Sequence, residues 1–457
     1  MARPTALSGF PEWLPEQRIV EQVVLDRMRA TFESWGYSSI ETRAVEPLEQ
    51  MLRKGEIDKE VYVLRRLHAS DDDSSGESAG SALGLHFDLT VPLARYVLEH
   101  GGHLHFPFKR YQIQKVWRGE RPQEGRYREF LQVDIDVIDV DTLAFHHEVE
   151  VAQVMSEAFA GLPLPALRMQ VNNRHLIEGF YRGVGVLDVP AVMRVIDKLD
   201  KVPEDTIRDL LASEVAVTGA AADLILAFAG ISADDSSFAD RVVALGVSDP
   251  LLDQGLEELV RVVDGTSPLR SDRFSVVADL RIARGLDYYT GTVYETSMAG
   301  FEWLGSVCSG GRYDALATDG ATTYPGVGIS FGLTRTLGPL FSRGLLRATR
   351  SVPTCVVVAV ADEGQRQASD GVAAALRARG VPVEVSPSAA KFGKQIRYAD
   401  RRGIPFVWFV DTDGSHSVKD IRTGVQVDAD PGSWSPDDLD RHPRILFEPE
   451  PTKETPR

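Results

Sequence analysis

The sequence predicts an α+β protein with more than one domain. Three observations support this class: a pair of strands at 108–118 and 126–138, a mostly helical stretch at 172–268, and alternating strands and helices beyond residue 350. At 457 residues the chain is long for one hydrophobic core, so two or three domains are expected. Its hydrophobic content of 43% and charged content of 26% are ordinary for a soluble globular protein.

The first long element is an amphipathic helix over residues 16–36. Its apolar residues recur largely three or four positions apart: Ile19, Val23, Leu25, Met28 and Phe32. Gly36 supplies the stop. A short strand is expected at 37–47.

The next segment contains a stretch with too few apolar residues to form part of a hydrophobic core. Residues 69–81 are acidic, small and polar, which indicates a mobile loop between two strands. Residues 83–97, LGLHFDLTVPLARYV, read as a strand that enters a helix near Pro92.

The segments 108–118 and 126–138 form the clearest strand pair. In the second segment apolar residues alternate with a set that is mostly polar, so the strand has one apolar face and one face with an aromatic, an amide and two acids. The apolar set is Leu131, Val133, Ile135 and Val137, and the other set is Phe130, Gln132, Asp134 and Asp136. An acidic face within a sheet is costly unless it meets a cation or water. A solvent-facing side, as in many antiparallel sheets, is the plainer alternative. The polar loop 119–125 joins the two segments and is bracketed by Arg118 and Arg126.

The rest of the chain divides by its pattern. Residues 172–268 read as an inserted helical subdomain. Beyond 350 a βαβαβ alternation indicates a small parallel or mixed α/β domain. The domain bounds expected are 1–171 and 269–345 for the two parts of one larger domain, 172–268 for the insertion, 350–443 for the C-terminal domain and 444–457 for a disordered tail.

Composition limits the functions that the chain can have. A net charge of −17 argues against broad, nonspecific nucleic-acid binding, although it leaves room for a local basic patch. We expect no membrane span and no signal peptide. The two cysteines, Cys308 and Cys355, fit a reducing cytoplasm. His146 and His147 are more typical of a solvated helix face than of a metal site, and no metal site is predicted.

Residues 283–295, ARGLDYYTGTVYE, are the most informative run. Arg284 supplies a fixed fork of donors suited to phosphate or carboxylate oxygens. If the segment is a strand, Tyr288 and Tyr289 point to opposite faces, and only one lines a pocket. A hairpin with a surface arginine and two half-buried tyrosines is the plain alternative for each residue alone.

As one string, this run resembles a signature of the histidyl-tRNA synthetases. Four further segments agree. KVWRGERPQEGRYREF at 115–130 resembles motif 2 of class II synthetases, and GVGISFGLTRTL at 326–337 resembles motif 3. SVCSGGRYD at 306–314 resembles a second histidine-specific signature, in which two glycines let backbone approach the ligand, and HFDLTVPLAR at 86–95 resembles a substrate-binding segment. The resemblance implies an antiparallel class II sheet flanked by helices, with a C-terminal anticodon-binding domain.

The resemblance also implies roles for particular residues. At the ATP end, Arg118 would clamp the α-phosphate, Arg126 would assist, Glu120 and Phe130 would hold adenine, and Arg335 would reach the γ-phosphate. At the histidine end, the implied contacts are Asp88 and Thr90 to the α-amino group, Gln132, Asp136, Tyr289 and Tyr313 around the side chain, and Arg284 to the reacting carboxylate. Arg284 and Arg118 would be the catalytic residues.

Two positions depart from the family pattern. Arg43 stands where motif 1 usually has a proline, so dimerisation is inferred from the fold and the 16–36 helix. Asp136 stands where many members have glutamate, which is one methylene longer.

The resulting hypothesis is a cytoplasmic, homodimeric enzyme with no membrane partner. It would use ATP and Mg²⁺ to activate L-histidine and then charge tRNA(His). Lys394, Arg397 and Arg401 share one helical face and are the predicted tRNA contacts, with a solvated helix face as the alternative.

Two other functions are weighed against the enzyme. A silent histidine-sensing paralogue, such as the regulatory subunit of ATP phosphoribosyltransferase, typically lacks the signature arginine and the C-terminal domain. A bare tRNA-binding module would not need both Arg118 and Arg335.

Overall fold

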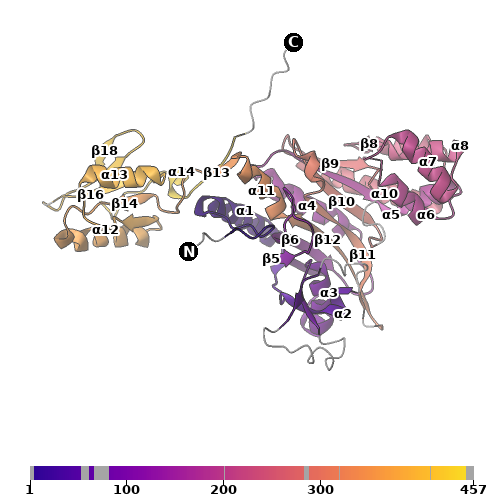
Figure 1. Cartoon of the computed structure of the whole chain (residues 1–457), viewed down its shortest axis with the longest axis horizontal. Coiled ribbons are helices and arrows are strands. Elements are labelled where there is room, and N and C mark those ends of the chain that lie inside the picture. Colours follow the sequence, from indigo (N-terminus) through magenta and orange to yellow (C-terminus); the bar gives the residue numbers. More distant parts are fainter. Residues whose placement is uncertain are drawn as a thin grey trace, which may run out of the picture. The chain divides into compact units, whose positions relative to one another are not determined.

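The computed structural model describes residues 5–52, 61–65, 82–199, 201–282, 288–318, 320–411 and 413–448. They divide into two compact units (Figure 1). The first lies within residues 1–11 and 27–339, and the second within 12–26 and 340–457. Helix α1 (Pro15–Ser34) therefore contributes to both units.

A nine-stranded mixed sheet is the centre of the first unit. Its strands, in spatial order, are β1 (Ser38–Ser39), β5 (Phe108–Trp117), β6 (Glu129–Ile138), β12 (Thr323–Gly332), β11 (Cys308–Thr318), β10 (Thr292–Met298), β7 (Leu167–Asn173), β9 (Phe274–Asp279) and β8 (Ser232–Ala233). The six strands from β5 to β7 pair antiparallel, whereas β1 with β5 and β7 with β9 pair parallel. The predicted sheet is confirmed, with parallel pairs near its two edges.

Helix α4 (His146–Ala160) covers the apolar face of this sheet. Phe159 packs edge-on against Phe331 of β12, with ring centroids 5.0 Å apart. The apolar residues of β6 lie on the same face, and Val133, Ile135 and Val137 are at most 1% exposed. Burial of these side chains against α4 stabilises the sheet. The opposite face of the sheet carries the polar residues of β6.

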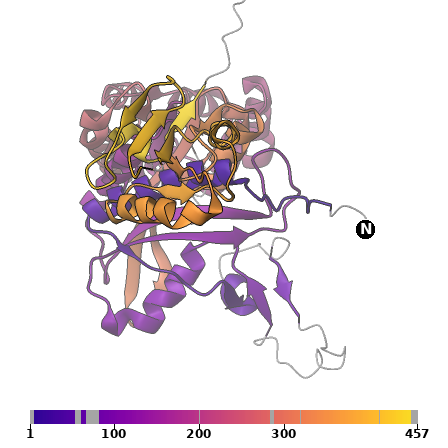
Figure 2. The same cartoon turned by 90° about the vertical axis from the view of Figure 1, so that its left-hand side faces the viewer.

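A smaller three-stranded sheet lies beside the large one. It contains β2 (Val45–Pro47), β4 (Leu83–Leu85) and β3 (Val63–Leu64), with α2 (Leu48–Leu52) alongside. Figure 2, seen from the side, separates the two sheets. After β4 the chain enters α3 (Thr90–His100), which confirms the predicted strand-to-helix passage. The loop expected at 69–81 lies outside the described residues.

The stretch between β7 and β9 is helical, as predicted. Its helices are α5 (Arg174–Gly183), α6 (Val189–Ile196), α7 (Glu204–Val215), α8 (Gly219–Ala229), α9 (Phe238–Val243) and α10 (Pro250–Thr266). Figure 1 shows most of them gathered beyond the β8 edge of the sheet. Helices α5 and α10 approach so closely that a Cβ on Gly179 would lie 2.1 Å from the Leu252 backbone nitrogen.

The second unit has the predicted βαβαβ order. It runs through β14 (Val356–Val358), α12 (Arg366–Ala378), β15 (Val383–Val385), α13 (Phe392–Arg401) and β16 (Phe406–Val410). The strands β15, β14 and β16 are parallel, and β17 (His416–Asp420) and β18 (Gln426–Asp428) add an antiparallel edge. The remaining elements are α11 (Leu333–Ser342), which begins in the first unit, β13 (Leu346–Ala348), α14 (Asp438–Arg441) and β19 (Ile445–Phe447).

Two details of the prediction are wrong. Val23 is 37% exposed, and the stripe of α1 instead uses Val20 and Val24, which continue its four-residue spacing. Residues 445–447 of the expected disordered tail form β19, because this short apolar run pairs with β13. Tyr288 and Tyr289 lie ahead of β10 and not in a strand, so the alternation of a strand does not determine where their side chains point. The domain bounds themselves stay predictions.

Within the described residues, no helix is long and apolar enough to cross a membrane.

Candidate active site

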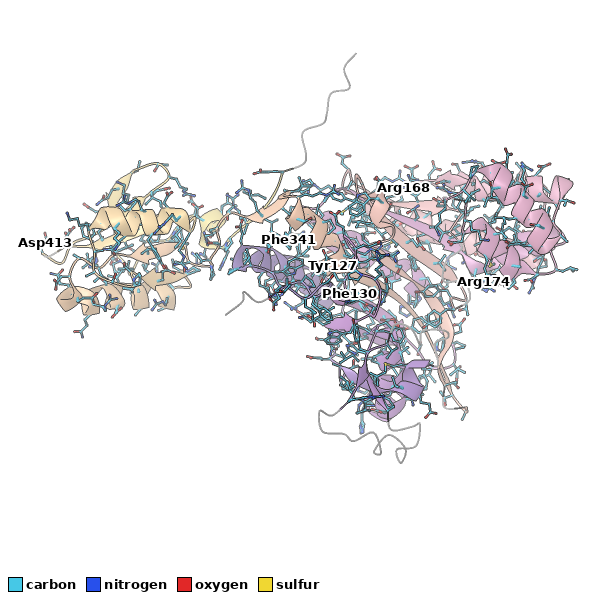
Figure 3. All side chains as sticks on the ribbon, viewed as in Figure 1. Tyr127, Phe130, Arg168, Arg174, Phe341 and Asp413 are labelled. Carbon is cyan, nitrogen blue, oxygen red and sulfur yellow. The ribbon has the colours of Figure 1, made fainter. Side chains whose placement is uncertain are left out.

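A cleft of about 210 Å³ opens on the polar face of the large sheet. Most of the predicted ligand-binding residues line it: Asp88, Thr90, Arg118, Glu120, Arg126, Phe130, Gln132, Tyr289 and Arg335. They come from β6, the start of α3, the β5–β6 loop, the turn before β10 and α11. Tyr127, which was not predicted, also lines the cleft and is labelled near Phe130 in Figure 3.

Three arginines gather at one end of the cleft. The Arg118 guanidinium lies 5.1 Å from the centre of the Phe130 ring, and its Nε donates to the Phe87 carbonyl oxygen. Glu120 lies 3.9 Å from Arg118 and 3.5 Å from Arg126. Burial lowers the pKa of Arg335, and the nearby Arg126 and Arg118 lower it further. One carboxylate among three guanidinium groups leaves this end positively charged, which suits a polyphosphate.

The loop that carries these groups is shaped by one glycine. Gly125 has φ +73°, and backbone hydrogen bonds between Gln123 and Arg126 close the turn. A Cβ at Gly125 would lie 2.2 Å from Leu304 Cδ2, so the loop also depends on close packing there.

The other end of the cleft is a buried polar wall. Asp88 is 4% exposed, and its Oδ1 accepts a hydrogen bond from the Val91 backbone N–H at the start of α3. Gln132 is 5% exposed, and its Nε2 lies within 3.2 Å of Asp134 Oδ2 and Ser330 Oγ. The polar face of β6 is therefore buried, and the solvent-facing alternative is wrong for these residues.

Asp136, farther along the same face of β6, and Tyr313 continue this wall but do not line the cleft. The Tyr313 hydroxyl donates to Asp136 Oδ1 over 2.7 Å, and Arg110 Nη2 lies 2.5 Å from Asp136 Oδ2. Burial raises the pKa of Tyr313, and the Asp136 charge raises it further. The Tyr288 ring stacks on Tyr313 at 5.8 Å and the Tyr289 ring turns toward the cleft. Only one of the adjacent tyrosines lines the cleft, as expected.

Glycines make room for these side chains. A Cβ on Gly311 would lie 2.7 Å from the Tyr289 ring, and one on Gly326 would lie 2.5 Å from the Tyr313 ring. A Cβ on Gly328 would lie 2.0 Å from Asp136 Oδ1. The family signature implies that Gly311 lies close to a ligand. In this structure the missing side chain of Gly311 instead leaves room for the Tyr289 ring.

Sequence reasoning missed Arg110, which is fully buried and directly opposite Asp136 in the register of β5 and β6. The alternation of β5 places Arg110, Gln112 and Gln114 on one face, so the cation that the acidic face needs was present in the adjoining strand. Arg284, the predicted catalytic arginine, lies outside the described residues.

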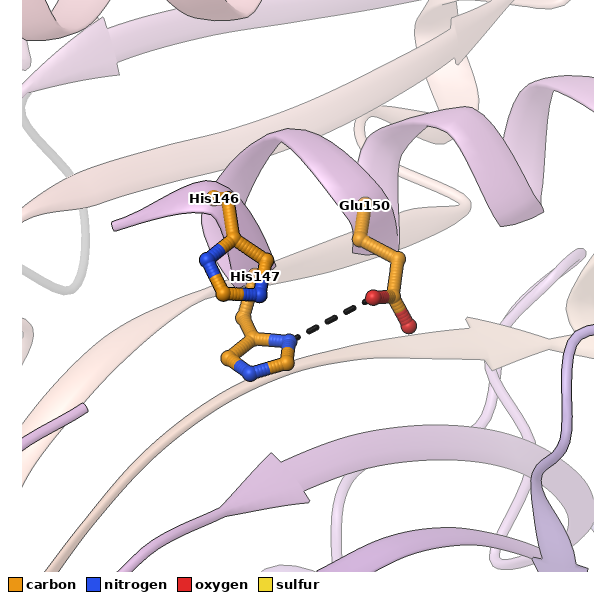
Figure 4. A group of neighbouring side chains, drawn as sticks. All are labelled: His146, His147 and Glu150. Carbon is orange, nitrogen blue, oxygen red and sulfur yellow. Dashed lines mark ion pairs between the residues drawn. The ribbon is translucent and has the colours of Figure 1, made fainter. Parts of the chain in front are cut away.

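A second cluster contains His146, His147 and Glu150 on α4 (Figure 4). His147 is 4% exposed and its Nδ1 lies 3.4 Å from Glu150 Oε2, so the solvated-face interpretation is wrong for His147. Lys109 Nζ lies 2.6 Å from Glu150 Oε1, and the Tyr37 hydroxyl donates to the same oxygen. These contacts hold the pKa of Glu150 down at about 2, although its burial acts in the opposite direction. The Lys109 ammonium therefore already pairs with this carboxylate.

The predicted tRNA contacts are on α13 in the second unit. Lys394, Arg397 and Arg401 are exposed on one face, whereas Gln395 and Ala399 face the interior. Within the part of the chain that the structure describes, none of the three forms an ion pair.

The fold has known relatives. A family model described as histidyl-tRNA synthetase matches residues 9–336, and one described as anticodon binding domain matches residues 354–433. The histidine–tRNA ligase of Cutibacterium acnes is 56% identical over 98% of this chain and 99% of its own length. That of Thermobifida fusca is 51% identical over 95% and 98%.

Solved structures agree with these matches. The crystal structure of histidyl-tRNA synthetase from a Nostoc species superposes with a TM-score of 0.83 at 33% identity, covering 94% of this chain and 97% of that one. A Bacillus halodurans structure described as an ATP phosphoribosyltransferase regulatory subunit/histidyl-tRNA synthetase gives 0.69 at 18% identity over 87% and 97%, which shows the fold alone.

A synthetase-like region followed by an anticodon-binding domain is the plan of an aminoacyl-tRNA synthetase. The chain belongs to the histidyl-tRNA synthetase family.

Proposed function

We propose that the chain activates L-histidine with ATP and transfers the histidyl group to tRNA(His). The observation that carries this proposal is a single cleft with a cationic end, formed by Arg118, Arg126 and Arg335, and a buried polar end that contains Asp88 and Gln132. A positively charged end fits a triphosphate, and a wall of carboxylate and amide groups fits a small amino acid with a nitrogen-bearing side chain.

In the first half-reaction, a carboxylate oxygen of histidine forms a bond to the α-phosphorus of ATP. The bond from that phosphorus to the bridging oxygen breaks, and pyrophosphate leaves. Two anions approach each other in this step, so fixed guanidinium groups act mainly by offsetting charge without reorganising. Arg118 is the described residue proposed for the α-phosphate, and Arg284 is proposed to assist it. Phe130 offers an aromatic surface for adenine.

Asp88 and Thr90 are proposed to bind the α-amino group. Asp88 is suited to this role because a backbone N–H of α3 fixes its carboxylate at the edge of the cleft. Tyr289 closes the same end. Asp136 and Tyr313 are proposed to act on the imidazole from beyond Gln132 on the same face of β6. Their mutual hydrogen bond and the Arg110 ion pair hold them in place.

Mg²⁺ would enter with ATP. Among the described residues that line the arginine end, Glu120 is the carboxylate, and it already faces Arg118 and Arg126. The cation would therefore be held mainly by triphosphate oxygens, as is usual for magnesium at nucleotide sites. When bound, it would neutralise part of the triphosphate charge.

We further propose that α13 contacts tRNA and that the enzyme is a cytoplasmic homodimer. The exposed cations of α13 support the first proposal, because unpaired lysine and arginine side chains attract the phosphate backbone. The dimer rests on the family resemblance. In the single chain the stripe of α1 is already buried, and Arg43 pairs with Glu46 and Glu99. Sedimentation analysis would test the dimer.

Histidine-dependent ATP–pyrophosphate exchange tests the enzyme proposal. The full chain should exchange label only when histidine is present, and it should not respond to other amino acids at the same concentration. A well-folded chain that binds histidine but does not exchange pyrophosphate would support the histidine-sensing alternative instead.

A further inference from the structure

Asp134 occupies the middle of the polar wall. It lies between Gln132 and Asp136 on one face of β6, and the strand register places it opposite Gln112 and Ser330. The side chain is 1% exposed. Its Oδ1 is buried without a hydrogen-bond partner among the described residues. A buried carboxylate oxygen without a hydrogen-bond partner lowers the stability of the fold, so Asp134 calls for an explanation other than stability.

Asp134 contacts the cleft through one neighbour. Gln132 Nε2 donates to Asp134 Oδ2 over 3.1 Å and lies 3.2 Å from Ser330 Oγ. Gln132 and Ser330 both line the cleft. An ionised carboxylate only accepts hydrogen bonds, so it selects the NH₂ side of the glutamine amide. The amide oxygen of Gln132 is then left for another donor.

We propose that Asp134 is a positioning residue for substrate recognition: it holds the amide nitrogen of Gln132 and thereby presents the Gln132 carbonyl oxygen to an N–H donor of bound histidine. This inference rests on the proposed function. It adds a residue that makes no contact with the substrate and acts through the orientation of an amide group. An amide held the other way would point its own N–H groups at that donor, which is a repulsive arrangement.

The surrounding charges determine the pH range in which Asp134 is ionised and can accept a hydrogen bond from the Gln132 amide nitrogen. Arg110 Nη2 lies 2.5 Å from Asp136 Oδ2 but 4.0 Å from Asp134 Oδ2, so the single guanidinium mainly neutralises Asp136. Burial raises the pKa of Asp134 to about 7, opposed by Arg110 and reinforced by Asp136. The other titratable groups facing it are Tyr289 and Cys308. Protonated Asp134 would carry an O–H donor and lose its preference for the NH₂ side of Gln132.

The test measures KM for histidine and for ATP in pyrophosphate exchange by the full chain. Asp134→Leu removes the acceptor and should raise KM for histidine about tenfold, since losing one hydrogen-bond partner in such a site costs at least a factor of this order. KM for ATP should stay within about twofold, because the arginine end is unchanged. Asp134→Asn keeps an oxygen that can accept, and should recover much of the loss.

The matched control is Asp139→Asn. Asp139 lies one residue beyond β6 and accepts a hydrogen bond from the Val140 backbone N–H, outside the cleft. This variant should leave both KM values unchanged. Thermal unfolding of every variant separates a binding defect from a folding defect.

A double-mutant cycle with Gln132→Ala tests the route of the effect. If Asp134 acts through Gln132, Asp134→Leu should change KM for histidine by less than about twofold in the Gln132→Ala background, in contrast to its large effect in the wild-type background. If Asp134→Leu does not fold, Asp134→Ala, which also removes the acceptor, takes its place in both backgrounds.

Additive effects in the cycle, or an unchanged KM for histidine in Asp134→Leu, would overturn the inference while leaving the proposed function intact. Absence of exchange in the wild-type chain would overturn the proposed function itself.

Discussion

The cleft wall and the exposed face of α13 both carry charged side chains, yet the two regions place them in opposite environments. On the wall, Arg110 is fully buried, and Asp134 and Asp136 are 1% and 4% exposed. On α13, Lys394 and Arg397 are exposed and form no ion pair with a described residue. Buried, hydrogen-bonded charges fix the shape of a small site, whereas exposed charges attract a polyanion without fixing its position.

The difference predicts how each region responds to substitution. Removing one partner from a buried charge pair leaves the other charge uncompensated, which typically costs about 3–5 kcal/mol. Removing an exposed cation affects mainly long-range attraction and is sensitive to salt. Substitutions at the cleft should therefore have large, substrate-specific effects, and those on α13 should have small, additive ones.

The largest effect is expected for Arg118→Ala. The rate of adenylate formation should fall about 10²–10³-fold, as for loss of a well-placed donor to developing charge. Rapid-quench measurement of adenylate formation in a single turnover would measure it. Arg121→Ala is the matched control, because Arg121 is exposed in the same loop and does not line the cleft. If the two variants slowed the reaction equally, loop charge in general, and not the Arg118 position, would be responsible.

A large pH effect is expected from Asp134. Its pKa is raised to about 7 in the folded chain, so the folded state binds more protons than the unfolded state between about pH 4 and 7. The free energy of unfolding contributed by Asp134 should therefore fall as pH rises through this window, by at most about 1.4 kcal/mol per unit.

Urea denaturation of the wild type and Asp134→Asn from pH 4.5 to 8 measures that contribution. The stability of the wild type relative to the variant should decline toward pH 7 and then level off. A constant difference across the range would show that Asp134 stays ionised when folded.

Gly328→Ala should have a moderate effect on the same wall. The new Cβ would lie 2.0 Å from Asp136 Oδ1 and 2.7 Å from the Ile135 carbonyl oxygen, so the carboxylate must move. We expect a higher KM for histidine and a loss of about 1–3 kcal/mol in unfolding free energy, which is usual for overpacking. Gly102→Ala is the control, since a Cβ there would have no neighbour within 4 Å. An unchanged KM would mean that Asp136 does not influence histidine binding.

The smallest effect is expected for Arg397→Ala. Affinity for tRNA should fall a few-fold, and the slope of log affinity against log salt should decrease by roughly 0.7–0.9, which corresponds to one phosphate contact. Pyrophosphate exchange should not change. Arg366→Ala on α12 removes an equally charged residue that already pairs with Glu363, so it should leave the salt slope intact. If the slope of log affinity against log salt fell equally in both variants, the net charge of the protein, and not a contact at Arg397, would explain the effect.

Strands and helices could be predicted from the sequence where the spacing of apolar residues along one segment determines the structure. The alternation around Ile135 predicted β6, and the spacing of Met28 and Phe32 predicted α1. The motif order predicted that Arg118 and Arg335, which are far apart in sequence, share a cleft, and the structure brings them to one.

What the sequence did not reveal depends on strand register. Arg110 faces Asp136 only because β5 and β6 pair residue by residue in one particular register, which no local pattern specifies. The same register makes Asp134 a buried neighbour of Gln132 instead of a solvent-facing acid. The short strand β19 was missed because its partner, β13, lies about a hundred residues earlier in the chain.

The glycines at 311, 326 and 328 have a consequence for attempts to redesign this enzyme for other amino acids. Each leaves a space that a side chain from elsewhere fills: the rings of Tyr289 and Tyr313, and the carboxylate of Asp136. A mutant library that kept every polar residue of the cleft but varied these three positions would displace the polar groups it meant to preserve. A more useful library would keep the three glycines and replace the side chains that fill their space with smaller or differently charged ones.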